Sequence, residues 1–237
     1  MRLFDQIEDG AIRAIDAIDI ALVDDPHPWE VRRGVAIAAN WRVEQAANPR
    51  LFNGRMTMIS ALALDGATLT GTAHAIDFST FLYWRKAADK AGAAHVFAYA
   101  LPVAADGRLI AVKMAAHTAN PGLTYFAAGS FEPGDFPGGR MEFAANAHRE
   151  VREETGIDLG GVRTEQGFLL ARAGDALVVA RRYWLDEEAA TIAARIRAHV
   201  AADPDPEIDG PVVIEPGTIP EPTTRHMRLV LRHFAGG

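Results

Sequence analysis

The sequence predicts a protein of mixed α/β class, in which short strands and amphipathic helices follow one another along the chain. Three observations support this prediction. Apolar runs of strand length are joined by short turns that contain Asp65-Gly66 or Asp106-Gly107. Longer segments between these runs carry apolar residues at helical spacing. The composition, 49% hydrophobic and 23% charged, is ordinary for a folded globular protein.

The N-terminal part, residues 1–92, is expected to form a small α+β unit ahead of a larger domain at residues 93–237. Residues 11–23 fit either a strand or a short helix, because β-branched residues and alanines are mixed there. The other predicted elements are an amphipathic helix at 29–47, a hairpin of strands at 55–64 and 68–75, and a helix at 79–92.

The larger domain alternates strand pairs with helices. Two pairs of apolar runs flank Ala105-Asp106-Gly107 and Ala173-Gly174-Asp175, and each pair predicts a hairpin. The predicted strands are at 95–104, 109–116, 125–131, 162–171, 176–185 and 212–214, and the predicted helices at about 142–155, 186–203 and 221–234. The last helix should bury Met227, Val230, Leu231 and Phe234 and expose a basic face.

The helix at 142–155 ends in a run of charged residues, Arg149-Glu150-Val151-Arg152-Glu153-Glu154-Thr155-Gly156-Ile157. At about 100° per residue, Glu150, Glu153 and Glu154 share one arc, so the opposite face can be buried. Like charges at this spacing repel by about 0.2–0.5 kcal/mol per pair, and a divalent cation with oxygen ligands would offset this repulsion. For this run alone, a solvated charged helix face is the alternative.

The loop before this helix contains Gly129 and Asp135. Loop and helix together resemble the Nudix box: Gly, five residues, Glu, seven residues, then Arg-Glu-apolar-x-Glu-Glu-x-Gly-apolar. The helix half matches at every position from Arg149 to Ile157. In the loop half, Asp135 stands where the family has Glu, and thirteen residues separate it from Arg149. An alternative alignment gives the acid role to Glu142, and the additional residues form an insertion.

The resemblance implies a Nudix-type α/β/α sandwich with an N-terminal α+β extension. It also implies a hydrolase that cleaves the diphosphate of a nucleoside diphosphate linked to another group. Mg²⁺ or Mn²⁺ would be held by Glu150, Glu153, Glu154 and the main-chain carbonyl of Ala128, and Arg149 would orient the carboxylates. Relatives of this kind are often homodimers.

A general base in this family often lies outside the box. Glu207 and Asp209, in an acidic loop, are candidates, and Glu187 and Glu188 are weaker ones. A solvated loop is the alternative for Glu207 and Asp209, and a favourable position in a first helical turn is the alternative for Glu187 and Glu188. The sequence does not decide among them.

Substrate contacts are expected from the insertion, where Phe136 and Arg140 would close over a base or sugar. His117 is a further candidate, with a plain surface position as its alternative. A short segment also resembles the N-terminal region of Nudix proteins that hydrolyse UDP-sugars, and it comprises Trp41, Asn48, Pro49, Leu51, Phe52, Asn53 and Gly54. The expected substrate is therefore a nucleotide sugar or an ADP-ribose-like compound. Alternatively, Trp41, Leu51 and Phe52 are core residues and Asn53-Gly54 is a turn.

Composition and charge exclude several other classes. The net charge of −7 argues against nucleic acid as the main partner. The absence of cysteine excludes disulfides and thiol catalysis. No stretch approaches the roughly 18 apolar residues of a membrane span, and no apolar signal region follows Met1, so a cytoplasmic protein is expected. A module that binds and senses a nucleotide metabolite without cleaving it is the alternative to an enzyme.

Overall fold

The computed structural model describes residues 3–118 and 120–235, which divide into two compact units. Both units are assembled from separate stretches of the chain. Unit 1 comprises Met1–Gln6, Ala17–Val96 and Ser130–Glu142, and unit 2 comprises Ile7–Asp16, Phe97–Gly129 and Phe143–Gly237. The single boundary between residues 92 and 93 stays a prediction. Within the described residues, no helix has the length and apolar character needed to cross a membrane.

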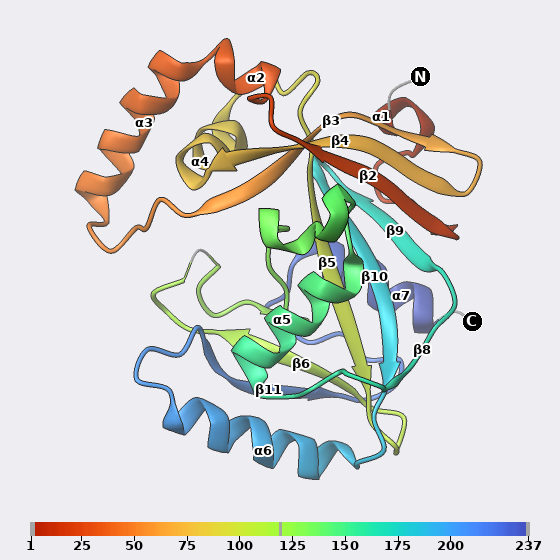
Figure 1. The fold of residues 1–237 in the computed structure, drawn as a ribbon. Coiled ribbons are helices and arrows are strands. Elements are labelled where there is room, and N and C mark those ends of the chain that lie inside the picture. Colours follow the sequence, from red (N-terminus) through yellow and green to blue (C-terminus); the bar gives the residue numbers. More distant parts are fainter. Residues whose placement is uncertain (1–2, 119, 236–237) are drawn as a thin grey trace. The chain divides into compact units, whose positions relative to one another are not determined.

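Figure 1 shows the helices and strands of the two units. The helices are α1 (Leu3–Gln6), α2 (Pro28–Val31), α3 (Gly34–Ala47), α4 (Phe78–Lys86), α5 (Phe143–Thr155), α6 (Ala189–Ala202) and α7 (Arg225–Ala235), with the 3-10 turns η1 (Pro133–Asp135) and η2 (Pro137–Gly139). The strands are β1 (Ile12–Ile15), β2 (Ala17–Val23), β3 (Arg55–Asp65), β4 (Thr68–Asp77), β5 (His95–Val103), β6 (Leu109–Met114), β7 (Thr124–Tyr125), β8 (Arg163–Thr164), β9 (Phe168–Ala173), β10 (Ala176–Trp184) and β11 (Ile208–Ile214).

The sheet of unit 1 is mixed and has the strand order β2-β4-β3. β3 and β4 form the predicted antiparallel hairpin, and Gly66 at its turn has a φ of 59°, which a residue without Cβ adopts at little cost. β2 pairs with β4 in parallel. The ambiguous segment 11–23 is therefore strand, divided at Asp16 into β1 and β2, and not helix.

The predicted helix at 29–47 is two helices, α2 and α3, with two residues between them. An amphipathic helix would bury its apolar residues, but Val35 and Val43 are 88% and 67% exposed, and Ile37 is the buried residue of α3. The prediction of one amphipathic helix is therefore wrong about the number of helices and about which apolar residues are buried. Apolar residues occur on several sides of α3, so its spacing alone did not select the buried face.

The core of unit 1 is built around two tryptophans. Trp29 of α2 is fully buried, and its indole N–H donates to the main-chain oxygen of Asp89 at 3.0 Å. Trp84 of α4 packs with it in a cluster that also contains Ile37, Met56, Met58, Ile76 and Ala93. α4 ends six residues before its predicted end, because the Asp89 carboxylate accepts the N–H of Ala91 and favours a turn over a helix.

The segment that resembles UDP-sugar hydrolases has a structural role at Asn53. The side-chain oxygen of Asn53 accepts the N–H of Ser79 at 2.8 Å, near the start of α4, where the N-cap residue Asp77 makes no side-chain cap bond. Phe52 is 83% exposed, so the alternative that makes it a core residue is wrong.

His27 gives unit 1 a predictable response to acid. It is fully buried, and burial is the main reason that its pKa falls from 6.5 to about 4. A base with a lowered pKa contributes stability that is present above pH 6.5 and is lost as the pH falls toward 4. The shift corresponds to about 3 kcal/mol of unfolding free energy. His27→Asn keeps an acceptor for the Trp29 N–H, which His27 Nδ1 now accepts at 3.0 Å.

We therefore expect urea unfolding of the wild type to lose more stability between pH 7 and pH 4 than that of His27→Asn. The difference between the two curves isolates His27 from His226, whose pKa is also lowered to about 4 by burial. Parallel curves over this range would contradict the assignment of acid sensitivity to His27.

The sheet of unit 2 has the strand order β1-β9-β10-β5-β6-β11, with β7 paired to β6 and β8 paired to β10. Figure 1 shows α5 in front of this sheet and α7 behind it. α6 packs on β11 and β6, and α7 packs on β9 and β10. Helices on both faces confirm the mixed α/β fold class, and the burial of Met227, Val230 and Leu231 confirms the predicted apolar face of α7.

The predicted strand at 125–131 is wrong beyond Tyr125, where β7 ends. The main-chain N–H of Ala128 bonds to the Glu154 side chain, so it is not used in a strand ladder. The predicted strand at 162–171 is also wrong as one element. It is divided into β8 and β9 by Gly167, which has a φ of 66° and leaves no room for a Cβ beside the Ile15 oxygen. β11 starts four residues earlier than predicted.

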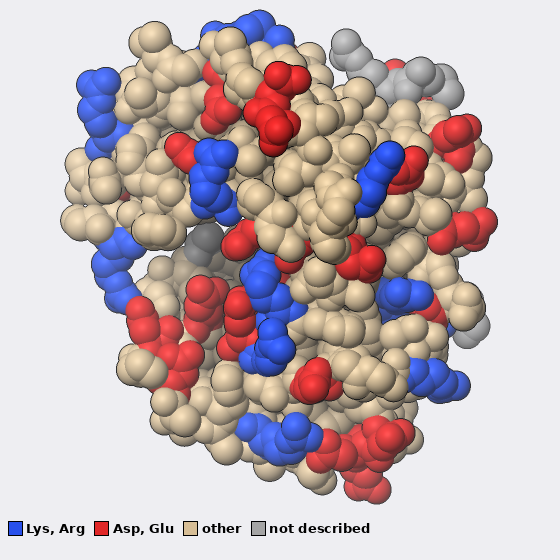
Figure 2. Space-filling model, viewed as in Figure 1, with Lys and Arg blue, Asp and Glu red and all other residues tan. Residues whose placement is uncertain are grey.

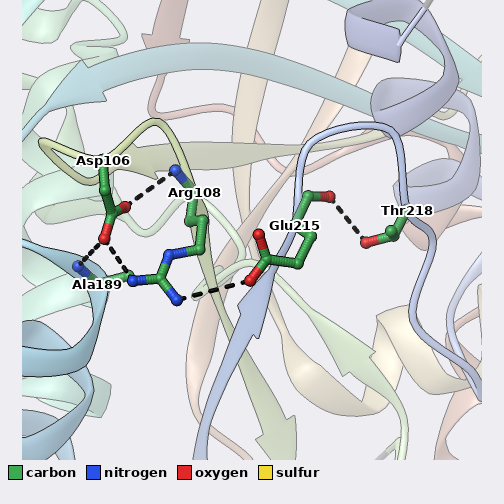
Figure 3. Close-up of polar contacts among 5 residues, drawn as sticks. All are labelled: Asp106, Arg108, Ala189, Glu215 and Thr218. Atoms are coloured by element: carbon green, nitrogen blue, oxygen red, sulfur yellow. Dashed lines mark hydrogen bonds and ion pairs between the residues drawn. The ribbon is translucent and has the colours of Figure 1, made fainter.

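The turn between β5 and β6 is tied to the start of α6 (Figure 3). Asp106 accepts the N–H of Ala189 at 3.0 Å and pairs with Arg108 at 2.5 Å. Arg108 also lies 3.5 Å from the carboxylate of Glu215, at the end of β11. The Arg108 guanidinium holds the pKa of the Asp106 carboxyl below its usual range. These contacts fix the first turn of α6 against the sheet edge.

Candidate active site

Helix α5 carries the candidate site in unit 2. Phe143, Ala147 and Val151 are buried at helical spacing, and Gly156 ends the helix with a φ of 70°. The sequence predicted that all three carboxylates would lie away from the buried face. This is wrong for Glu154, which is 8% exposed, whereas Glu153 is exposed and Glu150 is half-buried.

Gly129 marks a close approach of the preceding loop to α5. A Cβ atom added at this position would overlap the carboxylate of Glu150. The φ of Gly129 is not positive, so the requirement is one of space and not of backbone conformation. Gly129 thus allows the Glu150 carboxylate to lie directly against the main chain that follows Ala128.

Glu154 is the central carboxylate of the site. Its Oε2 is buried and has no hydrogen-bond partner among the described residues, while the N–H of Ala128 bonds to its side chain. Burial raises the pKa of Glu154 well above its usual range, and the negative charges of Glu150, Glu207 and Glu153 raise it further. A proton or a cation at this position would relieve both effects.

Arg149 holds two of the carboxylates on α5. Its guanidinium lies 2.6 Å from Glu150 Oε1 and 3.3 Å from Glu153 Oε2, the latter at the predicted spacing of four residues. On the face seen in Figure 2, basic and acidic side chains are mixed over α5 and α6. This pattern agrees with carboxylates that are oriented by neighbouring arginines.

Glu207 is the base candidate that lies near these carboxylates. The charge of Glu207 raises the pKa of Glu154. The pKa of Tyr125 is raised to about 12, chiefly by burial, with smaller contributions from the charges of Glu154 and Glu207. Glu207 is exposed, and its main-chain oxygen accepts the N–H of Ala115 at 2.9 Å. The sequence placed Glu207 in a late loop, and the structure places it just before β11.

The other base candidates have different surroundings. Asp209 lies 3.3 Å from Lys113, and Glu187 pairs with Arg195. Glu188 is the N-cap residue of α6 and is exposed. None of these three carboxylates is among the charges that shift the pKa of Glu154.

The predicted contacts from the insertion belong to unit 1. Phe136 is buried and packs edge-on against Phe131, and Arg140 forms an ion pair with Asp19. Asp135 is buried and accepts the N–H of Glu132 at 2.8 Å in a capping box. Phe136 and Asp135 therefore make contacts within their own loop, and Arg140 contacts β2.

His117 lies in unit 2, in the turn after β6. Its Nε2 is 3.8 Å from the carboxylate of Asp205, so its contact is with an acidic loop. Nearby, the side-chain amide of Asn120 donates to the Tyr125 hydroxyl at 3.4 Å. A role for His117 in contacting substrate stays a prediction.

No pattern in the sequence pointed to Tyr99 on β5. Tyr99 is fully buried, and its hydroxyl lies 2.6 Å from Nδ1 of His226 on α7. Burial raises the pKa of Tyr99 well above its usual value, with a smaller contribution from the charge of Glu154. A tyrosine inside an apolar strand matches no spacing rule, so its place near the carboxylates required the tertiary structure.

The donor set can be compared with the needs of a cation. Carboxylates are the ligands that Mg²⁺ and Mn²⁺ prefer, and the unpartnered oxygen of Glu154 fits such an ion. Within the described part of the chain, however, no three histidine or acidic side chains converge at metal-ligand spacing. Glu150, whose charge raises the pKa of Glu154, now contacts Arg149.

Comparisons with known proteins find solved structures of low similarity and no similar curated sequence. No family model and no curated protein sequence matches the chain. A MutT protein from Methanosarcina mazei Go1 matches with a TM-score of 0.40 and 18% identity, over 59% of this chain and 91% of its own. The protein DR0079 from Deinococcus radiodurans matches with a TM-score of 0.40 and 14% identity, over 78% of this chain and 90% of its own.

Proposed function

We propose that the chain is a divalent-cation-dependent hydrolase of the Nudix type. The observation that supports this proposal is Glu154, a buried carboxylate with an unpartnered oxygen, influenced by the charges of Glu150, Glu153 and Glu207. Burying a carboxylate without a counter-charge is costly, so this arrangement needs protons or a cation to be stable. The match of residues 149–157 to the helix half of the Nudix box favours a cation.

In the proposed site, Glu150, Glu153 and Glu154 would hold Mg²⁺ or Mn²⁺ together with the main-chain carbonyl of Ala128. When bound, the ion would neutralise charge on diphosphate oxygens and lower the pKa of a coordinated water. Arg149 keeps two of the carboxylates in orientation. Gly129 leaves the space in which the Glu150 carboxylate lies.

Glu207 is the proposed general base. It is exposed, so it can exchange its proton with solvent, and its charge acts on both Glu154 and Tyr125. In this role it takes a proton from the water whose oxygen bonds to phosphorus. The bridging phosphorus–oxygen bond of the diphosphate then breaks, and a nucleoside monophosphate and the phosphate of the second group are released. The chemistry asked of the protein is mainly positioning and charge neutralisation.

The proposed substrate is a nucleoside diphosphate joined to a sugar or a similar group. The resemblance of the segment around Phe52-Asn53-Gly54 to UDP-sugar hydrolases supports this choice, as does the presence of unit 1. His117, which lies in the same unit as the carboxylates of α5, is proposed as a specificity contact. The second candidate function is a module that binds the same compounds without cleaving them.

Removal of divalent cations is expected to abolish hydrolysis. The test uses UDP-glucose, ADP-ribose and a nucleoside triphosphate, with Mg²⁺ or Mn²⁺, and measures release of nucleoside monophosphate. Excess EDTA should reduce every rate to background, and added Mg²⁺ should restore it, because the carboxylates alone cannot neutralise a polyanion. Full turnover in EDTA would contradict the proposal.

The same panel separates the two candidate functions. A sensor would bind one of these compounds in calorimetry and release no monophosphate with either metal. An enzyme would show turnover that depends on Glu154 and not on Glu188, an exposed carboxylate at the start of α6. Glu188→Gln is therefore the matched control for substitutions in the proposed site.

A further inference from the structure

Unit 1 contains a second arrangement of reactive groups, on the face of its three-stranded sheet. The Ser60 Oγ of β3 lies 2.8 Å from Nε2 of His74 on β4. The other ring nitrogen of His74, Nδ1, lies 2.8 Å from the main-chain oxygen of Asp25, just after β2. Because Ser60 pairs with Thr72 and Val23 pairs with His74, the sheet register brings these three groups together.

The Asp25 carbonyl fixes which nitrogen of His74 carries the proton. A carbonyl oxygen can only accept, so the neutral imidazole donates from Nδ1 to Asp25. Nε2 is then unprotonated and accepts the hydroxyl proton of Ser60. The Thr72 carbonyl, at 3.4 Å from Ser60 Oγ, is the weaker alternative acceptor. A hydroxyl, an imidazole base and a group that orients the base are the parts of an activated serine nucleophile.

The backbone beside Ser60 is strained. Ala61 has a φ of 52°, and within the described residues it is the one residue other than Gly with a positive φ. The pairing of β3 with β4 also shifts between Ser60 and Ala63, which marks a β-bulge. Bulges and left-handed residues re-aim side chains and concentrate at functional sites. Ala61 lies within this bulge, so one local irregularity of the backbone marks the position of this serine.

His27 supports the base from the other side. Its ring packs edge-on against His74, with the ring centroids 4.9 Å apart. Since burial lowers the pKa of His27 to about 4, this neighbour is neutral at pH 7 and places no positive charge beside His74. His74 is buried, whereas Ser60 is half-buried, so the base is more shielded from solvent than the serine.

We propose that Ser60 is a nucleophile activated by His74, and that it forms a second reactive centre for small carboxylic esters. Ser60 Oγ bonds to the acyl carbon and its proton moves to His74 Nε2. The ester carbon–oxygen bond breaks, and the leaving alcohol takes that proton. Water then attacks the acyl-serine with His74 as base, and the proton returns to Ser60 Oγ as the acid leaves. The balance is ester plus water to acid plus alcohol.

The test is covalent labelling of the full chain with a small alkyl fluorophosphonate, followed by peptide mass spectrometry. Ser60 Oγ should displace fluoride and carry the adduct. Ser60→Ala should lose the adduct completely, and His74→Gln should slow labelling at least tenfold. Hydrolysis of p-nitrophenyl acetate should fall in parallel in both variants. Thermal melting confirms that each variant is folded.

Ser130→Ala is the matched control, because Ser130 also lies close to a histidine, 2.9 Å from His95 Nε2, in the same unit. It should keep the labelling rate of the wild type. If His74→Gln does not fold, the test is the loss of the adduct in Ser60→Ala, provided that its melting temperature is unchanged. An unlabelled Ser60, or a folded His74→Gln that labels at the wild-type rate, would show that the pair is only a structural hydrogen bond.

Discussion

Glu154→Gln is expected to lower nucleotide hydrolysis by about a hundredfold or more, which corresponds to roughly 2.7 kcal/mol of barrier. The substitution keeps the shape of the side chain and an oxygen that can accept the Ala128 N–H. It removes the negative charge that would hold the cation. Because the carboxylate is buried beside Glu150 and Glu153, its removal also relieves repulsion and desolvation, so stability should hold or rise.

The measurement pairs monophosphate release with thermal melting at several Mg²⁺ concentrations. Wild type should gain stability as Mg²⁺ is added, and Glu154→Gln should lose most of this gain, because an ion that binds only the folded state stabilises it. Glu188→Gln should behave as wild type in both assays. A Glu154→Gln protein that is less stable and fully active would show that this carboxylate serves the fold.

Gly129→Ala is expected to have the second largest effect, although it adds only one methyl group and changes no charge. The new Cβ would overlap the Glu150 carboxylate, so either the loop or this carboxylate must move. We expect a loss of about 1–3 kcal/mol of stability, typical of overpacking at a tight contact. Hydrolysis should fall at least about tenfold, because displacement of one proposed ligand misplaces the cation.

Gly134→Ala is the matched control, since a Cβ at Gly134 meets nothing within 4 Å and its φ is not positive. This change should stay within about 0.5 kcal/mol of the wild type. The cause can be isolated with Glu150→Ala, which removes the group that the new methyl meets. In that background Gly129→Ala should cost much less stability, and an undiminished cost would place the conflict elsewhere.

The turns and the helix end could be predicted from single residues, because their conformation depends on local geometry. Gly66 and Gly156 have the positive φ values expected at a hairpin turn and a helix end. The Arg149–Glu153 pair also follows from spacing alone. Local rules failed to identify the buried face of α3. Val35 and Val43 lie in this helix, and their side chains are nevertheless exposed.

Local patterns in the sequence are enough to establish a mixed α/β protein whose helix α5 carries carboxylates at spacings of three and four. These features repeat within a few residues, so periodicity and turn chemistry are enough to read them. The burial of Glu154, the effect of the Glu207 charge on its pKa and the nearby Tyr99 depend on tertiary contacts. So was the Ser60–His74–Asp25 alignment, because strand register joins residues that no local pattern relates.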